Sequence, residues 1–260
     1  MANDIMKEIV VLEWTFAPLD YFEQPIHIIR DNYEMTIDKG KVEARIEAQY
    51  FDSEPDFQMK LHELLKSRFY GASILNQKPF ELSKPSMYRI HPDGRKSFTL
   101  FAEPGAMRVT GGNADLIVTG PDGKVISDSR QERIEKRNIL AERVEKYRTQ
   151  CPVLQGILKS WHSSFLKPEN ELVYLYEVRD ALSEKFGGCK KACRVLKVNE
   201  DSWNTFGGFA NDPSLEQGRH RGRNVGSLRE ATEDELTEAR TFIRELIEKY
   251  LDYLESNQHP

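Results

Sequence analysis

The residues best suited to bind an anion lie in one short segment near the C-terminus. Residues 218–229, GRHRGRNVGSLR, hold five cationic or protonatable side chains: Arg219, His220, Arg221, Arg223 and Arg229. A guanidinium presents two parallel N–H donors that match a phosphate group, and an imidazole is the side chain that exchanges a proton near neutral pH. We call residues 218–229 the cationic segment. Its residue types predict contact with a polyanion.

This positive charge is local, because the chain as a whole is acidic. The 260 residues include 37 Lys and Arg against 42 Asp and Glu, which gives a net charge of −5. Between residues 187 and 229, by contrast, eight basic side chains stand against four acidic ones. A polyanion is therefore expected to bind in this region rather than over the whole surface. The predicted nucleic-acid-binding residues are Lys190, Lys191, Arg194, Arg221, Arg223 and Arg229.

Histidine and arginine together can support cleavage of RNA without a metal ion. That reaction needs a group that deprotonates the 2′-hydroxyl or protonates the leaving oxygen, and cations that stabilise the charged phosphorane. On this hypothesis the catalytic residues are His220 and Arg219. The alternative interpretation is that the arginines pair with the acidic residues that follow them, or stay solvated, as surface charges usually do. Those acidic residues are Glu230, Glu233, Asp234 and Glu235.

Other chemistries lack their residue patterns. The histidines are scattered, and Cys189 and Cys193 have no second pair, so we predict no metal site and interpret these cysteines as buried apolar residues. No phosphate-binding glycine loop, dinucleotide fingerprint or serine nucleophile elbow occurs, so we predict no cofactor. The chain has three cysteines and neither a signal peptide nor a membrane-spanning apolar stretch. These features predict a cytoplasmic protein with reduced thiols that is not embedded in a membrane.

Two kinds of hydrophobic periodicity divide the chain. From residue 8 to about residue 128, short β-rich runs predict strands, among them 25–30, 33–38 and 42–51, with one helix over 57–69. Pro92-Asp93-Gly94 and Pro121-Asp122-Gly123 each predict the turn of a β-hairpin. Residues 1–128 are therefore expected to form a β-rich domain with one helix.

After residue 128 the periodicity becomes helical. A charged helix over 129–149 is predicted to connect the two domains. Thr232 and Glu235 have the spacing of a capping box at the start of the last helix, and Trp203 and Phe206 are interpreted as core residues rather than base-stacking rings. Residues 150–260 are expected to form an all-α bundle, which makes the fold class α+β. Its helices are predicted over 154–165, 171–186, 189–197, 201–210 and from residue 232 onward.

Over residues 150–256 the sequence resembles the HEPN domain, a small helical bundle of prokaryotic toxins, abortive-infection proteins and CRISPR-associated ribonucleases. The resemblance rests on two long helices and on the motif GRHRGRN just before the last helix, where that family keeps its active site. It implies a metal-independent ribonuclease, a setting in antiviral defence or in a toxin system, and a homodimer through the bundle. The family pattern places an arginine several residues before the histidine, but here those positions are Pro213, Ser214 and Leu215, so no residue carries over as a catalyst.

The leading prediction is an RNA-binding protein, with metal-independent endoribonuclease activity as its catalytic form. One alternative is a non-catalytic interaction or scaffold protein whose N-terminal domain recognises a protein partner and whose helical bundle dimerises. The other is a DNA-binding regulator in which residues 187–210 form a helix-turn-helix with Lys197-Val198-Asn199 at the turn.

Overall fold

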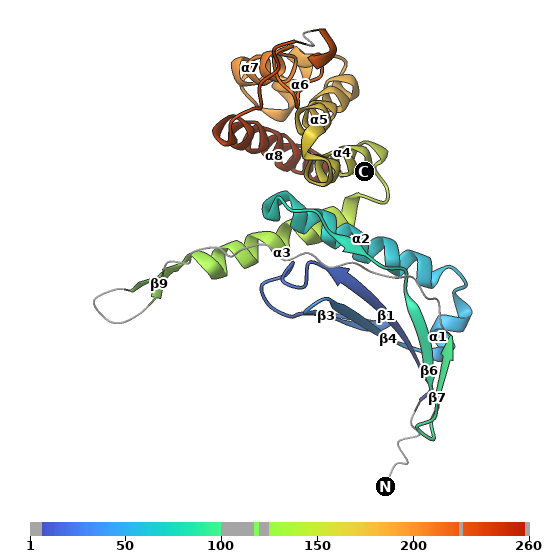
Figure 1. Cartoon of the computed structure of the whole chain (residues 1–260). Coiled ribbons are helices and arrows are strands. Elements are labelled where there is room, and N and C mark those ends of the chain that lie inside the picture. The colour runs from blue at the N-terminus through green and yellow to red at the C-terminus, as the bar shows by residue number, and fades with distance from the viewer. Residues whose placement is uncertain (1–6, 100–116, 120–124, 224–225, 258–260) are drawn as a thin grey trace. The chain divides into compact units, whose positions relative to one another are not determined.

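The fold is α+β, as predicted, with an antiparallel sheet followed by a helical region (Figure 1). The structure, a computed structural model, describes residues 7–99, 117–119, 125–223 and 226–257. Its contacts divide the chain into two compact units. Unit 1 comprises the described residues of 1–66 and 80–136, and unit 2 comprises those of 67–79 and 137–260. Two long helices, α2 (Phe57–Asn76) and α3 (Ser129–Tyr147), each contribute residues to both units.

Unit 1 is built on an antiparallel sheet. Among the described residues the sheet has seven strands in the order β2-β3-β4-β1-β6-β7, with β5 paired to the end of β1. Two further strands, β8 and β9, pair with each other in a separate ribbon. The strands are β1 (Ile9–Ala17), β2 (Ile26–Arg30), β3 (Tyr33–Asp38), β4 (Lys41–Glu47), β5 (Glu81–Leu82), β6 (Ser86–Ile90), β7 (Lys96–Thr99), β8 (Ile117–Thr119) and β9 (Val125–Asp128).

Turn chemistry explains how these strands connect. β3 and β4 are joined by Lys39 and Gly40, whose φ angles of 40° and 83° are the left-handed values that a tight two-residue hairpin requires. The predicted hairpin between β6 and β7 is confirmed, and Gly94 supplies a φ of 82° at its turn. β8 and β9 pair antiparallel as predicted, whereas the turn predicted at Pro121-Asp122-Gly123 lies outside the described residues.

The sheet buries one set of its side chains beneath the first part of α2. Along β1, Val10, Leu12 and Trp14 alternate onto one face and are almost completely buried. The contacts between α2 and the sheet include the rings of Phe57 and Tyr33, whose centroids lie 6.2 Å apart, and a hydrogen bond of 3.1 Å from Trp14 Nε1 to His62 Nδ1. The side of the helix that its hydrophobic periodicity predicts to be buried therefore faces the core.

Two predicted element boundaries were wrong. The strand expected over 42–51 ends at Glu47, because the β1–β4 ladder stops at the pair Ile9–Glu47, and the next residues form the short helix α1 (Ala48–Ser53). Helix α2 does not stop at Phe69 but continues to Asn76. Gly71 lies within this helix, and a Cβ at this residue would lie 2.4 Å from Cα of Ala141 on α3. The glycine is needed for close helix packing.

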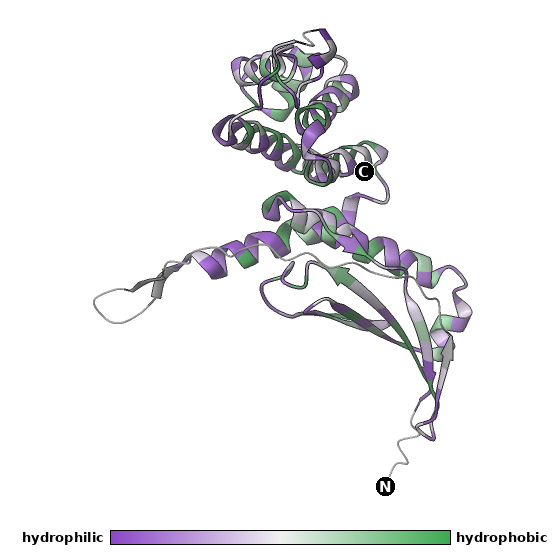
Figure 2. Cartoon of the chain, viewed as in Figure 1, coloured by the Kyte–Doolittle hydropathy of each residue, from purple (hydrophilic) through white to green (hydrophobic). Residues whose placement is uncertain are grey.

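Unit 2 contains the remaining helices, whose stripes of polar and apolar residues are visible in Figure 2. Trp161, Trp203 and Tyr250 are completely buried in it. Two predicted helix ends are confirmed: α5 stops at Gly187, which has a φ of 73°, and α8 begins with the Thr232–Glu235 capping box. The helices are α4 (Pro152–Leu166), α5 (Glu171–Phe186), α6 (Cys189–Leu196), α7 (Glu200–Ala210) and α8 (Glu233–Ser256).

The burial of individual side chains tests the predictions made for the aromatic and cysteine residues of unit 2. Trp203 and Phe206 are buried, which confirms that they are core residues. Cys193 is buried and burial raises the pKa of its thiol to about 11, as suits a small apolar residue, whereas Cys189 is half-buried. No helix within the described ranges is both long enough and apolar enough to cross a membrane.

Candidate nucleic-acid interface

The cationic segment lies in the connection between α7 and α8, residues 211–232, and this connection is closed at its base. Leu215 and Arg229 form an isolated β-bridge. The backbone N–H of Arg229 donates to the Ser214 carbonyl (2.8 Å), and the N–H of Glu216 donates to the Arg229 carbonyl (3.0 Å). Leu215 is completely buried. The segment is therefore held at both ends by backbone pairing and by a buried side chain.

Helix α7 ends directly before this connection. Its last residue is Ala210, and Asn211-Asp212-Pro213 follow. The residue before a proline avoids the helical region. Asp212 then fixes the turn, because its carboxylate accepts hydrogen bonds from the backbone N–H (2.9 Å) and the hydroxyl (2.7 Å) of Ser214, which lower the pKa of the Asp212 carboxyl.

Arg221 anchors the segment to other parts of unit 2. Its Nη1 donates to the carbonyl oxygens of Glu169 (2.9 Å) and Glu216 (3.0 Å), and its Nη2 donates to Asn170 Oδ1 (2.7 Å). Glu169 and Asn170 belong to the 3₁₀ turn Pro168–Asn170 between α4 and α5. All three acceptors are uncharged groups, so Arg221 is fixed in place while its positive charge is not neutralised.

Arg219 lies on an aromatic ring. Its guanidinium carbon is 3.8 Å from the centroid of the Tyr176 ring, and its Nη1 donates to Asn211 Oδ1 over 3.2 Å. The guanidinium carbon of Arg179 is 4.9 Å from the same centroid, and Arg179 Nε donates to the Trp203 carbonyl over 3.2 Å. The attraction between a cation and the ring face orients Arg219 without removing its charge.

His220 and Arg223 differ from Arg219 and Arg221, because no described residue pairs with their side chains. Arg223 is exposed and His220 is half-buried, and the backbone N–H of Arg223 donates to the His220 carbonyl over 2.9 Å in a 3₁₀ turn. Within the part of the chain that the structure describes, neither side chain makes a hydrogen bond or an ion pair. Both are therefore open to an external ligand.

Arg229 differs from the other arginines of the segment, because it pairs with a neighbouring acidic residue, as the alternative interpretation predicts. Its Nη1 and Nη2 donate to the two carboxylate oxygens of Glu235 over 2.8 and 2.7 Å. This guanidinium is the largest cause that lowers the pKa of Glu235 to about 2, and a hydrogen bond from the Thr232 N–H adds to it. Arg229 thus closes the base of the loop and is a poor candidate for contacting an anion.

The other predicted binding residues lie on α6. Lys190, Lys191 and Arg194 are all exposed. No hydrogen bond, ion pair or ring contact between described residues joins any of them to the cationic segment. The candidate site is therefore the segment itself, with Arg219, His220, Arg221 and Arg223.

Sequence reasoning missed two residues of this site, Tyr176 and Arg179. They lie three residues apart on α5, a spacing that places them on one side of a helix. An aromatic residue followed three positions later by an arginine is a weak signal by itself. Their role becomes visible only when the fold brings Arg219, more than forty residues away in sequence, onto the ring.

Comparison with known proteins identifies no relative of this chain: no family model matches the sequence, and neither a curated protein nor a solved structure matches it. The function is therefore argued from the geometry of the site.

Proposed function

We propose that the chain binds single-stranded RNA through the cationic segment. The observation that carries this proposal is that Arg219, Arg221 and Arg223 make no ion pair with a carboxylate among the described residues, although the chain is acidic overall. A cluster of guanidinium groups without counterions repels itself, and an incoming phosphate backbone relieves that repulsion. Two of the three guanidinium groups are already oriented, which lowers the entropy lost on binding.

The contact between Arg219 and Tyr176 supports a single strand rather than a duplex. Proteins that bind single strands combine positive charge with flat groups on which unpaired bases stack, and a guanidinium plane is one such group. Tyr176 is half-buried and supports Arg219 from one side, so the other side of the guanidinium can receive a base.

The structure offers less support for a DNA-binding regulator. Helices α6 and α7 are joined by Lys197-Val198-Asn199, and Lys197 adopts the left-handed conformation, with a φ of 55°, that glycine often adopts in such turns. However, α7 would be the recognition helix, and its residues 200–210 contain neither Lys nor Arg. Its exposed Glu200 and Asp201 would repel a DNA phosphate.

Cleavage of the bound RNA would depend on His220. Its ring has no partner among the described residues, so it could accept or donate a proton at the RNA. Incubation of the protein with labelled RNA in EDTA tests this directly. Cleavage that disappears in His220→Ala would make the protein a metal-independent ribonuclease, and cleavage that persists would exclude His220 from the reaction. Four expectations from the sequence stay predictions: the defence or toxin setting, the homodimer, the protein partner of the N-terminal domain and the cytoplasmic location.

Binding itself is tested by fluorescence anisotropy with a labelled single-stranded RNA over a range of salt concentrations. We expect Arg219→Gln and Arg223→Gln each to reduce the slope of log affinity against log salt by about 0.7, the value for one phosphate contact on a single strand. Arg30→Gln is the matched control, because Arg30 is an exposed arginine of unit 1. A salt-independent affinity, or an equal loss in the control, would refute the proposal.

A further inference from the structure

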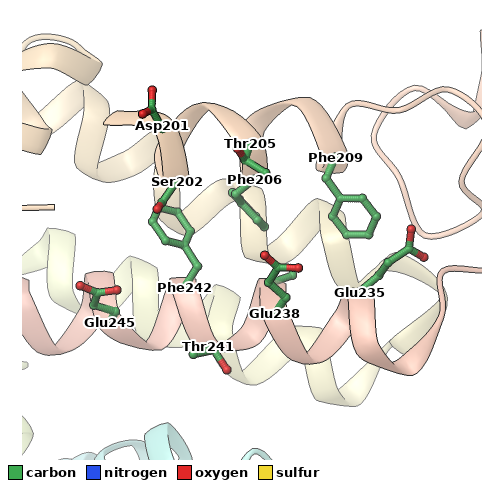
Figure 3. A pocket seen from close by; sticks show the side chains of 11 residues that line it. Asp201, Ser202, Thr205, Phe206, Phe209, Glu235, Glu238, Thr241, Phe242 and Glu245 are labelled. Carbon is green, nitrogen blue, oxygen red and sulfur yellow. The ribbon is translucent and has the colours of Figure 1, made fainter. Parts of the chain in front are cut away.

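A groove with charge opposite to that of the cationic segment lies between α7 and α8 (Figure 3). Its volume is about 630 Å³, within the range of ligand-binding clefts. Phenylalanine rings from both helices point into it, Phe206 and Phe209 from α7 and Phe242 from α8. The lining residues include neither Lys nor Arg. The groove therefore has an aromatic floor and negatively charged sides.

Its acidic side chains are available for a partner. Asp201 on α7 and Glu238 and Glu245 on α8 are exposed, and their carboxylates make no ion pair or side-chain hydrogen bond with any residue that the structure describes. The fourth carboxylate, that of Glu235, is occupied by Arg229. Three unpaired carboxylates beside an apolar floor favour a ligand that is both cationic and apolar.

The groove is long rather than compact. Its lining on α8 runs from Glu235 to Glu245, which at 1.5 Å per residue is about 15 Å. Glu238 and Glu245 lie seven residues apart, so they occupy the same side of α8 two turns from each other. A helix lying along the groove could place basic residues opposite both carboxylates and apolar residues over the rings, whereas a small organic cation would reach one of the carboxylates at a time.

We propose that this groove binds a cationic amphipathic helix of a partner protein. The apolar side of that helix contacts chiefly the half-buried ring of Phe209, which lies beside the buried rings of Phe206 and Phe242 on the floor, and its Lys or Arg side chains pair with Asp201, Glu238 and Glu245. RNA is excluded from the groove because the carboxylates repel phosphate. The proposal does not depend on RNA binding, since the two sites have opposite charge and share no residue.

The test uses a fluorescein-labelled peptide of about 14 residues, Leu and Lys in a helical amphipathic pattern and roughly 21 Å long as a helix. We expect Glu238→Gln with Glu245→Gln to weaken its affinity about fivefold at low salt, as loss of two exposed ion pairs predicts. The matched control is Asp180→Asn with Glu184→Gln, which removes the same charge from exposed positions on α5. The control should retain the natural affinity. An equal loss in both double variants would mean that the peptide responds to net charge alone, and would overturn the proposal.

Two further measurements locate the peptide. Phe209→Ala removes a half-buried ring from the floor, so it should weaken binding even at high salt, where ion pairs are screened. Hydrogen exchange in the complex should slow within residues 200–210 and 233–245. Protection confined to other residues, or equal binding of a peptide with Glu in place of every Lys, would contradict a helix seated in this groove.

Discussion

Alanine substitutions at Arg221 and at Arg223 should separate the structural role of the cationic segment from its binding role. The two residues have the same type and stand two positions apart, in the same 3₁₀ turn. Arg221 makes three hydrogen bonds of 2.7 to 3.0 Å, whereas Arg223 has no side-chain partner among the described residues. We therefore expect Arg221→Ala to destabilise unit 2 and Arg223→Ala to leave its stability unchanged.

The size of the Arg221 effect follows from its contacts. A hydrogen bond with a charged donor contributes about 1.5–3 kcal/mol when it is buried. Arg221 is half-buried, and the carbonyls it leaves can bind water instead, so the three bonds together should contribute about 1.5 kcal/mol rather than their sum. This corresponds to a fall in melting temperature of about 4 °C.

Thermal unfolding of the two alanine variants, beside the natural protein, measures the difference. RNA anisotropy on the same samples should show that Arg223→Ala loses affinity although it melts at the natural temperature. Hydrogen exchange should quicken between residues 214 and 229 in Arg221→Ala alone. Equal melting temperatures for the two variants would refute the assignment of Arg221 as the anchor.

Two further predictions concern charged pairs of unit 2. Glu171→Gln should lower the free energy of unfolding by about 3 kcal/mol, because it breaks a buried pair in which Arg240 binds both Glu171 oxygens over 2.5 and 2.9 Å. Glu233→Gln changes the exposed partner of Arg240 and should lower that free energy much less. Urea denaturation compares them, and equal losses would disprove the ranking. Because Arg229 holds the pKa of Glu235 near 2 against an ordinary value of 4.5, their pair stabilises the fold fully above pH 4.5 and is lost as the pH falls toward 2. The difference in melting temperature between the natural protein and Arg229→Gln should therefore shrink on acidification, and a constant difference would count against it.

The elements that could be predicted from the sequence are those whose cause is local. The hairpin at Gly94, the end of α5 at Gly187 and the Thr232 capping box each depend on a few adjacent residues. The continuation of α2 from Phe69 to Asn76 was not predicted, and the close approach of Ala141 to Gly71 within it is a long-range contact that adjacent residues do not reveal. The start of α1 depends on where β1 stops pairing, which also lies outside any local window.

The candidate site shows the same division between local and long-range causes. The clustering of guanidinium groups is evident from residues 218–229 alone. Which of them is anchored, stacked, neutralised or open depends on residues that are distant in sequence or fixed by the fold, such as Asn170 for Arg221 and Tyr176 for Arg219. Residue type predicts the kind of chemistry, and tertiary contacts decide which side chain can perform it.

The sharing of α2 between the two units has a practical consequence for dissecting the protein. Trp161 Nε1 donates to the Ser73 carbonyl over 3.0 Å, and Arg148 Nε donates to Ser67 Oγ over 2.9 Å, so residues far upstream satisfy buried donors of the helical unit. A truncated clone that starts after residue 129 would lack both acceptors, so the Trp161 indole N–H and the Arg148 Nε would lose these buried hydrogen bonds. A clone that keeps unit 2 intact should therefore begin no later than residue 67, and it necessarily also carries residues 80–136 of unit 1.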